Sequence, residues 1–388
     1  MLTVMLVGLA MGATVSIAQA AGGGDKKRTA SAIGNTVTLF MLLSLALTAL
    51  LLALRGGIVS IMSTAEEAVQ GTHAYLTVCF IGIPFITAYN IIASIFRGLG
   101  DSKNPMYFIA VACVVNIALD YYFMGTLHLG PAGAALGTTL SQAVSVLVSL
   151  AVILKRRLIS VRRADFRPQR AVMGKLLQIG VPVALQDGFI QISFVIITII
   201  ANRRGLTDAA AVGIVEKIIG FLFLIPSSML STVSALGAQN IGAGKPERAR
   251  LTLRYAAMIA CSFGIAVVIL TLFIAEPLVG LFTPDAAVAA AGGQYLRGYI
   301  WDSFFAGVQF SFSGYFCACG KSVLSFLHNI SSVVLVRVPG SYLASTLFPD
   351  TLFPMGLASA GGSLLSVMLC ILFYLKFCRE KNPAAQSA

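Results

Sequence analysis

AQAAGGG at residues 18–24 and AQNIGAG at residues 238–244 are two versions of one segment, 220 positions apart. After a slip of three residues in the offset, PAGAA at 131–135 corresponds to PMGLA at 354–358. A repeat that recurs at one nearly fixed offset is the sequence signature of a duplicated structural unit. The chain is therefore predicted to contain two copies of one unit.

Lipid is the predicted solvent of most of this chain. Hydrophobic residues make up 57% of it and charged residues only 11%, whereas a soluble domain carries about 25% charged residues. The apolar runs are continuous, as in membrane-spanning helices, and lack the alternation of barrel strands. We therefore predict an all-α polytopic membrane protein. The expected helices cover residues 1–21, 32–54, 71–99, 104–126, 132–154, 172–201, 209–236, 251–282, 292–320, 322–346 and 354–378.

The net charge of +12 would suit a nucleic-acid partner, but the distribution of the basic residues indicates membrane topology instead. Of the 27 Lys and Arg residues, 21 lie in six segments between the predicted helices: 22–31, 97–103, 155–175, 241–254, 317–323 and 376–388. Such clustering is typical of cytoplasmic loops. We expect no nucleic-acid partner, and we place the protein in the cell (inner) membrane as a multi-pass protein with a cytoplasmic C-terminus.

The repeat also predicts how the helices are grouped. Both glycine-rich segments fall on the predicted cytoplasmic side, so a complete copy has an even number of helices, and six follow Val172. We predict two six-helix bundles related by a pseudo-two-fold axis along the membrane normal, a plan of secondary transporters whose substrate site lies between the halves. The expected parts are an N-terminal lobe of about four and a half helices (1–157), a basic cytoplasmic linker (158–171), a C-terminal lobe of six helices (172–379) and a polar cytoplasmic tail (380–388).

Nothing in the first copy matches residues 172–220 of the second. We expect the first bundle to lack its first helix and part of its second, because the sequence is truncated or starts at an internal methionine. A signal peptide that ends at residues 18–20 is the alternative for the first segment. The absence of a basic leader and the return of the Ala-Gln pair at 238–239 disfavour it.

Asn116 and Asp120 form the clearest polar group inside a predicted helix. An ionisable side chain there costs at least about 2.5–3.5 kcal/mol, which makes it a functional candidate. The two residues share a helix face, and Thr138 lies as far after the turn near Leu129 as Asp120 lies before it. A carboxylate, an amide and a hydroxyl suit Na⁺, and the carboxylate alone would suit a proton. A polar clamp between helices is the structural alternative.

Asp187 and Asp302 are candidates for a substrate cavity or a second coupling site. Gln191 shares the face of Asp187, and Pro182 is expected to kink that helix. Asp302 has Gln309 two turns further along its helix. Each carboxylate must face a cavity or a polar partner, because an unpaired charge in lipid is costly.

No motif in the sequence indicates an enzyme. GKS at 320–322 is preceded by Tyr315 where a phosphate-binding loop needs glycine, and its repeat mate GDS at 100–102 has no lysine, so both are predicted to be tight turns. None of the seven cysteines forms a CxxC pair. We expect no metal site, no cofactor and a driving force from a gradient of Na⁺ or H⁺. No chemistry is assigned to His73, His128 and His328.

The motifs resemble those of the multidrug and toxic compound extrusion (MATE) family over essentially the whole chain. The resemblance is carried by the two AQxxGxG loops, RGLGDSKNP at 97–105, NIALD at 116–120 and GPAGAA at 130–135. It implies a twelve-helix antiporter of two six-helix lobes that exports bulky, often cationic compounds in exchange for Na⁺ or H⁺.

The resemblance also implies site residues. An Asn and an Asp on the fifth family helix and a Thr on the sixth form a cation site in several members, and they match Asn116, Asp120 and Thr138. The family's first-helix Asp has no counterpart here. Asp187 lies on the helix that matches the seventh, where other members place an acid, and Asp302 is a loose match to an acid on the tenth.

We therefore predict a cation-coupled efflux transporter for small organic, mainly cationic substrates, in contact with membrane lipid and monomeric. Four acids, Asp120, Asp187, Glu216 and Asp302, are expected to be well buried in the membrane, against three intramembrane basic residues, which favours cationic cargo. A flippase for lipid-linked glycans, which needs a basic cavity, is one alternative. A truncated membrane protein that does not transport is the other.

Overall fold

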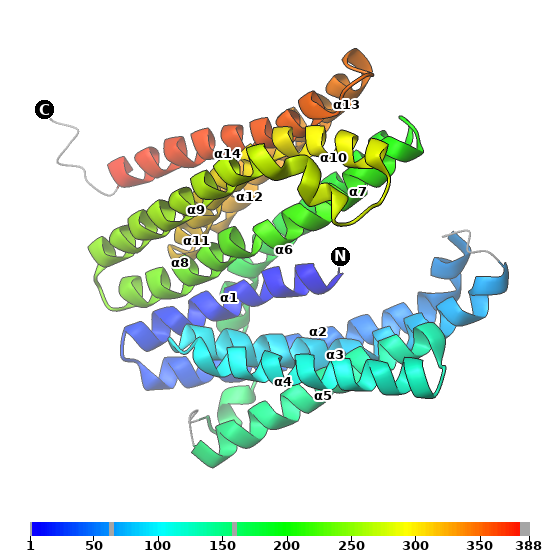
Figure 1. The fold of residues 1–388 in the computed structure, drawn as a ribbon. Coiled ribbons are helices and arrows are strands. Elements are labelled where there is room, and N and C mark those ends of the chain that lie inside the picture. Colours follow the sequence, from blue (N-terminus) through cyan, green and yellow to red (C-terminus); the bar gives the residue numbers. More distant parts are fainter. Residues whose placement is uncertain (1, 62–65, 157–160, 381–388) are drawn as a thin grey trace, which may run out of the picture. The chain divides into compact units, whose positions relative to one another are not determined.

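The computed structural model describes residues 2–61, 66–156 and 161–380, and every element in these ranges is helical (Figure 1). The bounds of the α-helices are α1 Leu2–Gly22, α2 Lys26–Ile61, α3 Glu66–Gly98, α4 Lys103–Asp120, α5 Gly130–Arg156, α6 Arg170–Asn202, α7 Leu206–Leu222, α8 Leu224–Gly242, α9 Pro246–Gly280, α10 Ala286–Tyr299, α11 Trp301–Ala318, α12 Ser322–Ser332, α13 Val338–Leu347 and α14 Phe353–Glu380. Three short helices complete the fold, namely η1 Tyr121–Thr126, η2 Arg163–Phe166 and η3 Val333–Arg337.

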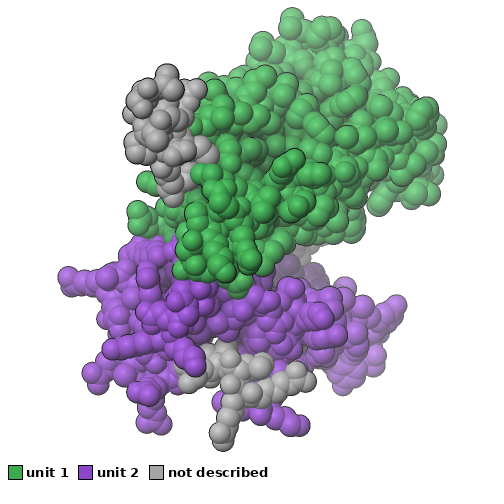
Figure 2. All heavy atoms as spheres, turned by 90° about the vertical axis from the view of Figure 1, so that its left-hand side faces the viewer, with its two compact units in different colours: residues 1–11, 178–388 green, residues 12–177 purple. Residues whose placement is uncertain are grey.

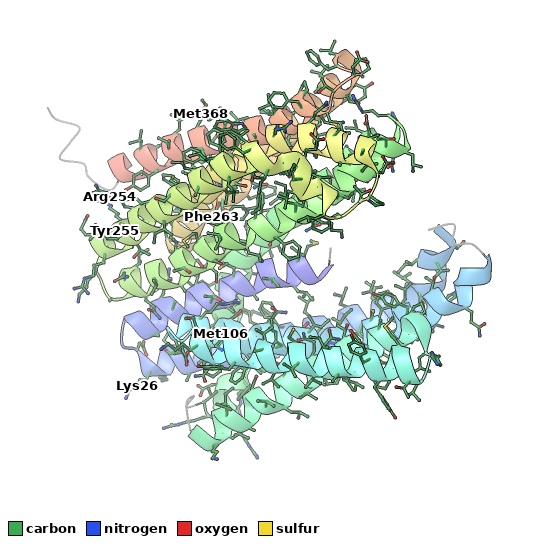
Figure 3. All side chains as sticks on the ribbon, viewed as in Figure 1. Lys26, Met106, Arg254, Tyr255, Phe263 and Met368 are labelled. Carbon is green, nitrogen blue, oxygen red and sulfur yellow. The ribbon has the colours of Figure 1, made fainter. Side chains whose placement is uncertain are left out.

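The prediction of an all-α polytopic membrane protein is confirmed. Among the described residues, 10 helical segments are long and apolar enough to cross a membrane. Their outward faces carry exposed apolar side chains such as Met106, Tyr255 and Met368 (Figure 3). Side chains of this kind are stable against lipid tails, which are as apolar as they are.

The chain separates into two compact units, which Figure 2 shows in different colours. Unit 1 comprises residues 1–11 and 178–388, and unit 2 comprises residues 12–177. The predicted lobe boundaries at 157 and 172 stay a prediction. Residues 157–160 and 381–388, which include nearly all of the predicted tail and the start of the linker, lie outside the described residues.

Four helices end in the same glycine turn, at the positions that the repeat relates. In each turn the glycine has a positive φ, between +71° and +90°, at Gly24, Gly100, Gly244 and Gly320. The N–H of the next residue reaches the carbonyl five residues back. Asp101 thus donates to the Phe96 carbonyl over 2.8 Å, and Lys321 donates to the Phe316 carbonyl over 2.8 Å. This hydrogen bond defines the Schellman turn, which needs a left-handed residue that glycine adopts most easily. The predicted tight turns are confirmed.

Two predicted helices are broken in the structure. The predicted helix 209–236 stops at Leu222 and starts again at Leu224, because Pro226 has no N–H and its ring would clash with the Leu222 carbonyl in a continuous α-helix. The predicted helix 292–320 is divided at Ile300 into α10 and α11.

The predicted helix 322–346 contains the π-helical turn η3, Val333–Arg337. Pro339 follows it, and in a regular α-helix this proline would clash with the carbonyl of Leu335. The wider turn of a π-helix accommodates such a mismatch. Arg337, at the end of η3, is buried in unit 1.

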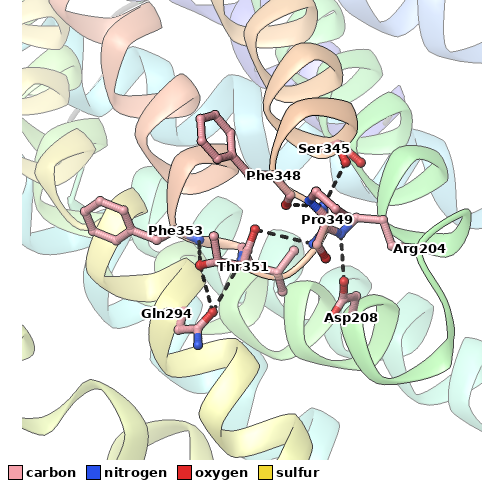
Figure 4. Close-up of polar contacts among 9 residues, drawn as sticks. Arg204, Asp208, Gln294, Ser345, Phe348, Pro349, Thr351 and Phe353 are labelled. Atoms are coloured by element: carbon pink, nitrogen blue, oxygen red, sulfur yellow. Dashed lines mark hydrogen bonds and ion pairs between the residues drawn. The ribbon is translucent and has the colours of Figure 1, made fainter.

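Arg204 links the turn between α6 and α7 to the turn between α13 and α14, both in unit 1 (Figure 4). It pairs with Asp208 at 2.7 Å and donates to the carbonyls of Ser345 at 2.9 Å and Pro349 at 2.7 Å. These carbonyls belong to the C-terminal turn of α13 and the segment that follows it, where backbone acceptors have no partner within the helix. A guanidinium is suited to this place because it has five donors and a charge that complements the helix terminus.

In unit 2 the described part of the predicted linker lies against α2. Asn35 donates to the Asp165 carbonyl over 3.2 Å and accepts from the Gln169 N–H over 2.7 Å, and Thr38 donates to the Phe166 carbonyl over 2.8 Å. These hydrogen bonds satisfy backbone groups that have no partner within a regular helix.

Candidate ion and substrate sites

Asn116 and Asp120 lie together in unit 2, one turn apart on α4. Asn116 Nδ2 and one carboxylate oxygen of Asp120 are buried without a hydrogen-bond partner among the described residues. Gly137 of α5 lies directly against them. A β-carbon at Gly137 would overlap the Asp120 carboxylate and would come within 3.5 Å of Asn116 Nδ2. Two polar groups are thus held side by side in a helix interface with unsatisfied bonding capacity.

Thr138 is not the α5 residue that faces this pair. Thr138 is exposed, whereas the residues on either side of it, Gly137 and Thr139, are buried. Successive residues on a helix point about 100° apart. The sequence prediction placed Thr138 and Asp120 at the same depth by counting residues from the turn between their helices. It did not take into account the direction in which each side chain points from α5. The role of all three residues in ion binding stays a prediction.

Gly137 is the residue that sequence reasoning missed here. It belongs to a buried stripe of small residues on α5 that also contains Gly133 and Ser141. The spacing of four residues was visible in the sequence, and such stripes let helices approach closely in membranes.

Asp302 and Arg337 form a second polar centre, in unit 1. Asp302 is 0% exposed, and neither of its carboxylate oxygens accepts a hydrogen bond of normal geometry among the described residues, although the Ser363 hydroxyl is close enough to interact with it. The Arg337 guanidinium donates to the Tyr299 hydroxyl and lies 4.7 Å from the centre of the Phe194 ring. Asp302 and Glu216 are both close enough to interact electrostatically with Arg337.

The charges at this centre do not cancel. When all three groups are ionised, Asp302 and Glu216 contribute two negative charges and Arg337 one positive charge, so one negative charge remains among them. Lys217 also interacts electrostatically with Glu216, but Lys217 is exposed and lies outside the buried centre. A net charge in a buried site is costly. Binding of a single monovalent cation or proton would neutralise the centre. The sequence does not predict this centre, because contacts between helices this far apart in the sequence leave no local pattern.

Asp187 lies on α6, away from the contacts described for Asp302. Its side chain is half-buried, and a β-carbon at Gly8 of α1 would come within 2.6 Å of its carboxylate. Cys317 of α11 is close enough to interact with it electrostatically. Gln191, one turn further on, is also half-buried. The neighbouring Gln186, which sequence reasoning missed, is buried and accepts from the Ser325 hydroxyl over 2.7 Å.

The model of the MatE family matches residues 1–122 and 182–343 of this chain. The chain belongs to the MATE family. The matched residues include Asn116, Asp120, Asp187 and Asp302, while Thr138 falls between the two matched segments. The family resemblance found in the sequence motifs is thereby confirmed.

Relatives and solved structures agree with this assignment. A probable multidrug resistance protein of Bacillus subtilis, YpnP, is 30% identical over 97% of this chain and 84% of its own length. A Shewanella oneidensis protein named as an FAD transporter is 24% identical over 96% of this chain and 83% of its own. The structure of a mutant of the Vibrio cholerae MATE transporter VcmN has the same fold, with a TM-score of 0.91 at 19% identity over 97% of this chain and 86% of its own.

Proposed function

We propose that this MATE-family protein is a secondary active efflux transporter that exchanges Na⁺ or H⁺ for bulky, mainly cationic drugs or metabolites. The observation that carries the proposal is the fully buried Asp302, whose carboxylate oxygens accept no hydrogen bond of normal geometry among the described residues. Arg337 offsets the charge of this carboxylate only in part, because the same guanidinium also interacts with Glu216, and a buried carboxylate whose charge is not fully compensated is disfavoured. The stability of the state that buries Asp302 would therefore depend on whether a cation or proton is bound to the carboxylate. Such a dependence is required for an ion gradient to drive transport.

Asp120 supports the same proposal in unit 2. An ion can drive a conformational change only by the difference in its affinity for the two states. A carboxylate that is ion-bound or protonated in one state and charged in the other supplies such a difference. Asp120, with an unpartnered carboxylate oxygen beside Asn116, meets this condition.

Cationic cargo is favoured by the acids of the described helices. Asp120, Asp187, Glu216 and Asp302 all lie in membrane-spanning segments or in α11, and none of them is exposed. An anionic dinucleotide is the second candidate class, since Arg337 supplies a buried cation in unit 1 and one relative is named as an FAD transporter.

Efflux assays of Asp120→Asn and Asp302→Asn test the proposal. Each change keeps the shape of the side chain and removes its charge, so efflux of ethidium from cells that express the protein should be abolished while membrane levels stay normal. Asp350→Asn, at an exposed position between α13 and α14, is the matched control and should transport normally. Normal efflux by both buried-site variants would refute the coupling role of these acids.

The inner-membrane location, the cytoplasmic C-terminus and a monomeric state belong to the same proposal. The first two rest on the basic segments between the helices. A green fluorescent protein fused to the C-terminus should fluoresce and a fused alkaline phosphatase should be inactive, whereas the reverse result would place the C-terminus outside.

A further inference from the structure

Buried polar side chains form a file along the facing sides of α11, α12 and α14 of unit 1, and hydrogen bonds join those around His328 and Gln309. They recur at spacings of three, four or seven residues, so those on each helix share one face. All of them are at most 6% exposed, in a bundle where apolar packing would be expected. The members are Asp302, Gln309 and Ser313 on α11, Ser322, Ser325, His328 and Ser332 on α12, and Ser359, Ser363 and Ser366 on α14.

His328 stands in the middle of this file and joins its three helices. One ring nitrogen, Nε2, lies 2.9 Å from the Ser313 hydroxyl of α11. The other, Nδ1, lies 2.6 Å from the Ser366 hydroxyl of α14. One helical turn away from Ser313 and Ser366, on the same two helices, Gln309 donates to the Ser363 hydroxyl over 3.2 Å.

The file leads from a surface turn to Asp302. At one end Ser322, beside the exposed Lys321, donates to the Gln178 carbonyl over 3.1 Å. One turn further Ser325 contacts Gln186. The eleven residues from Ser322 to Ser332 cover about 15 Å of helix, a large part of a hydrocarbon layer about 30 Å thick. Ser332 and Arg337 both lie against Gly362 of α14, and Arg337 interacts with Asp302, so the file reaches the polar centre of Asp302 beyond Ser332.

The partners of His328 allow it to pass a proton on. A neutral imidazole has one N–H and one free lone pair, and a serine hydroxyl both donates and accepts. When a proton moves from the Ser313 hydroxyl to Nε2, the N–H bond at Nδ1 breaks and its proton goes to the Ser366 oxygen. The ring changes tautomer, Ser313 recovers a proton from the neighbouring group on its side of the file, and Ser366 releases its original hydroxyl proton to the next group on the other side, so only protons move.

We propose that His328 is the relay of a proton path between the α11–α12 turn and Asp302. This inference rests on the proposed ion-coupled efflux, and it specifies H⁺ as the coupling ion at this site. The ionisable groups on the elements around His328 are Asp302, Tyr315 and Cys317 on α11, Arg337 at the end of η3, Arg170, Lys175 and Asp187 on α6, and Cys370, Tyr374, Lys376, Cys378, Arg379 and Glu380 on α14. None of these is a hydrogen-bond partner of the imidazole among the described contacts.

A purely structural clamp is the competing explanation, and His328→Gln separates the two. Glutamine offers one acceptor and one donor, so it can hold both serines, but it cannot exchange tautomers. A clamp therefore predicts normal transport by His328→Gln, and a relay predicts loss of proton movement. His128→Asn is the matched control, because His128 is exposed and has a φ of 50° that asparagine tolerates.

The test uses the full-length protein in liposomes that contain a pH-sensitive dye. An ethidium gradient is imposed and the resulting proton movement is followed. For His328→Gln we expect proton flux to fall at least about tenfold, with ethidium binding and ethidium–ethidium exchange within about twofold of the unmodified protein. Normal proton flux, or an equal loss of flux and exchange, would overturn the relay.

Ser366→Ala keeps the test decisive if His328→Gln does not fold. It removes one end of the relay and leaves the imidazole in place, so proton flux should fall while ethidium–ethidium exchange persists. Normal proton flux would overturn the proposal.

If an Na⁺ gradient but no H⁺ gradient drives transport by the unmodified protein, the relay fails and the proposed efflux function stands. If neither gradient drives it, the proposed function itself fails.

Discussion

Gly137 is the residue on which the Asn116–Asp120 pair most directly depends. A methyl group added there would displace the Asp120 carboxylate, and binding groups need placement within about 0.5 Å. Gly137→Ala should therefore lower ion-driven ethidium transport by about tenfold or more in reconstituted liposomes.

The matched control for that substitution is Gly125→Ala, in η1, where a β-carbon meets nothing within 4 Å. It should transport like the unmodified protein. Equal activity of both variants would show that the carboxylate position beside α5 is unimportant.

Arg337 is predicted to stabilise unit 1 by offsetting two buried acids. Arg337→Gln leaves Asp302 and Glu216 without their cation, and breaking a buried charge network costs about 3–5 kcal/mol. The melting temperature in detergent should drop sharply. The double variant Arg337→Gln with Glu216→Gln restores the original net charge and should recover part of the loss. A double variant less stable than the single one would contradict the charge argument.

The sequence predicted the pairing of Asn116 with Asp120, because their spacing is local. It did not predict Arg337 beside Asp302 and Glu216, or the hydroxyl partners of His328. Those contacts join helices that are distant in the sequence, and no periodicity in one helix carries information about the rotation of another. The same limit explains why Gly137, and not Thr138, faces Asp120.

Helices were predicted well from their apolar runs, whereas their interruptions were not. The break before Pro226 and the π turn before Pro339 follow from a proline that lies four residues after the interrupted carbonyl. Both prolines were visible in the sequence, but whether a proline ends, widens or only bends a helix depends on packing. No proline lies near the break at Ile300, and nothing in the structure explains it.

The α13–α14 turn is predicted to depend on Arg204. Hydrogen bonds from a charged donor are worth about 1.5–3 kcal/mol each at most, and several act together here. Arg204→Ala should lower the free energy of unfolding by roughly 2–3 kcal/mol, measured as a lower melting temperature of the purified protein. Arg203→Ala, at the exposed neighbouring position, is the control. A melting temperature equal to that of the control would refute the stabilising role.

In the molecule as a whole, each unit holds a candidate ion-binding acid, the half-buried Asp120 in unit 2 and the fully buried Asp302 in unit 1. Loss of one acid should therefore leave the other site able to bind an ion. Ion-protection assays against thermal unfolding should show partial protection by Na⁺ or low pH in Asp120→Asn, and none in the Asp120→Asn, Asp302→Asn double variant. Full protection of the double variant would mean that the ion binds elsewhere.

The most direct test is ethidium transport by the purified protein in liposomes, with an inwardly or outwardly directed gradient of Na⁺ or H⁺ as the only source of energy. Ion-coupled efflux predicts that ethidium accumulates against its gradient when one of these ions flows in the opposite direction, and that accumulation stops when an ionophore dissipates the gradient. Ethidium movement that is the same with and without either gradient would contradict ion-coupled efflux.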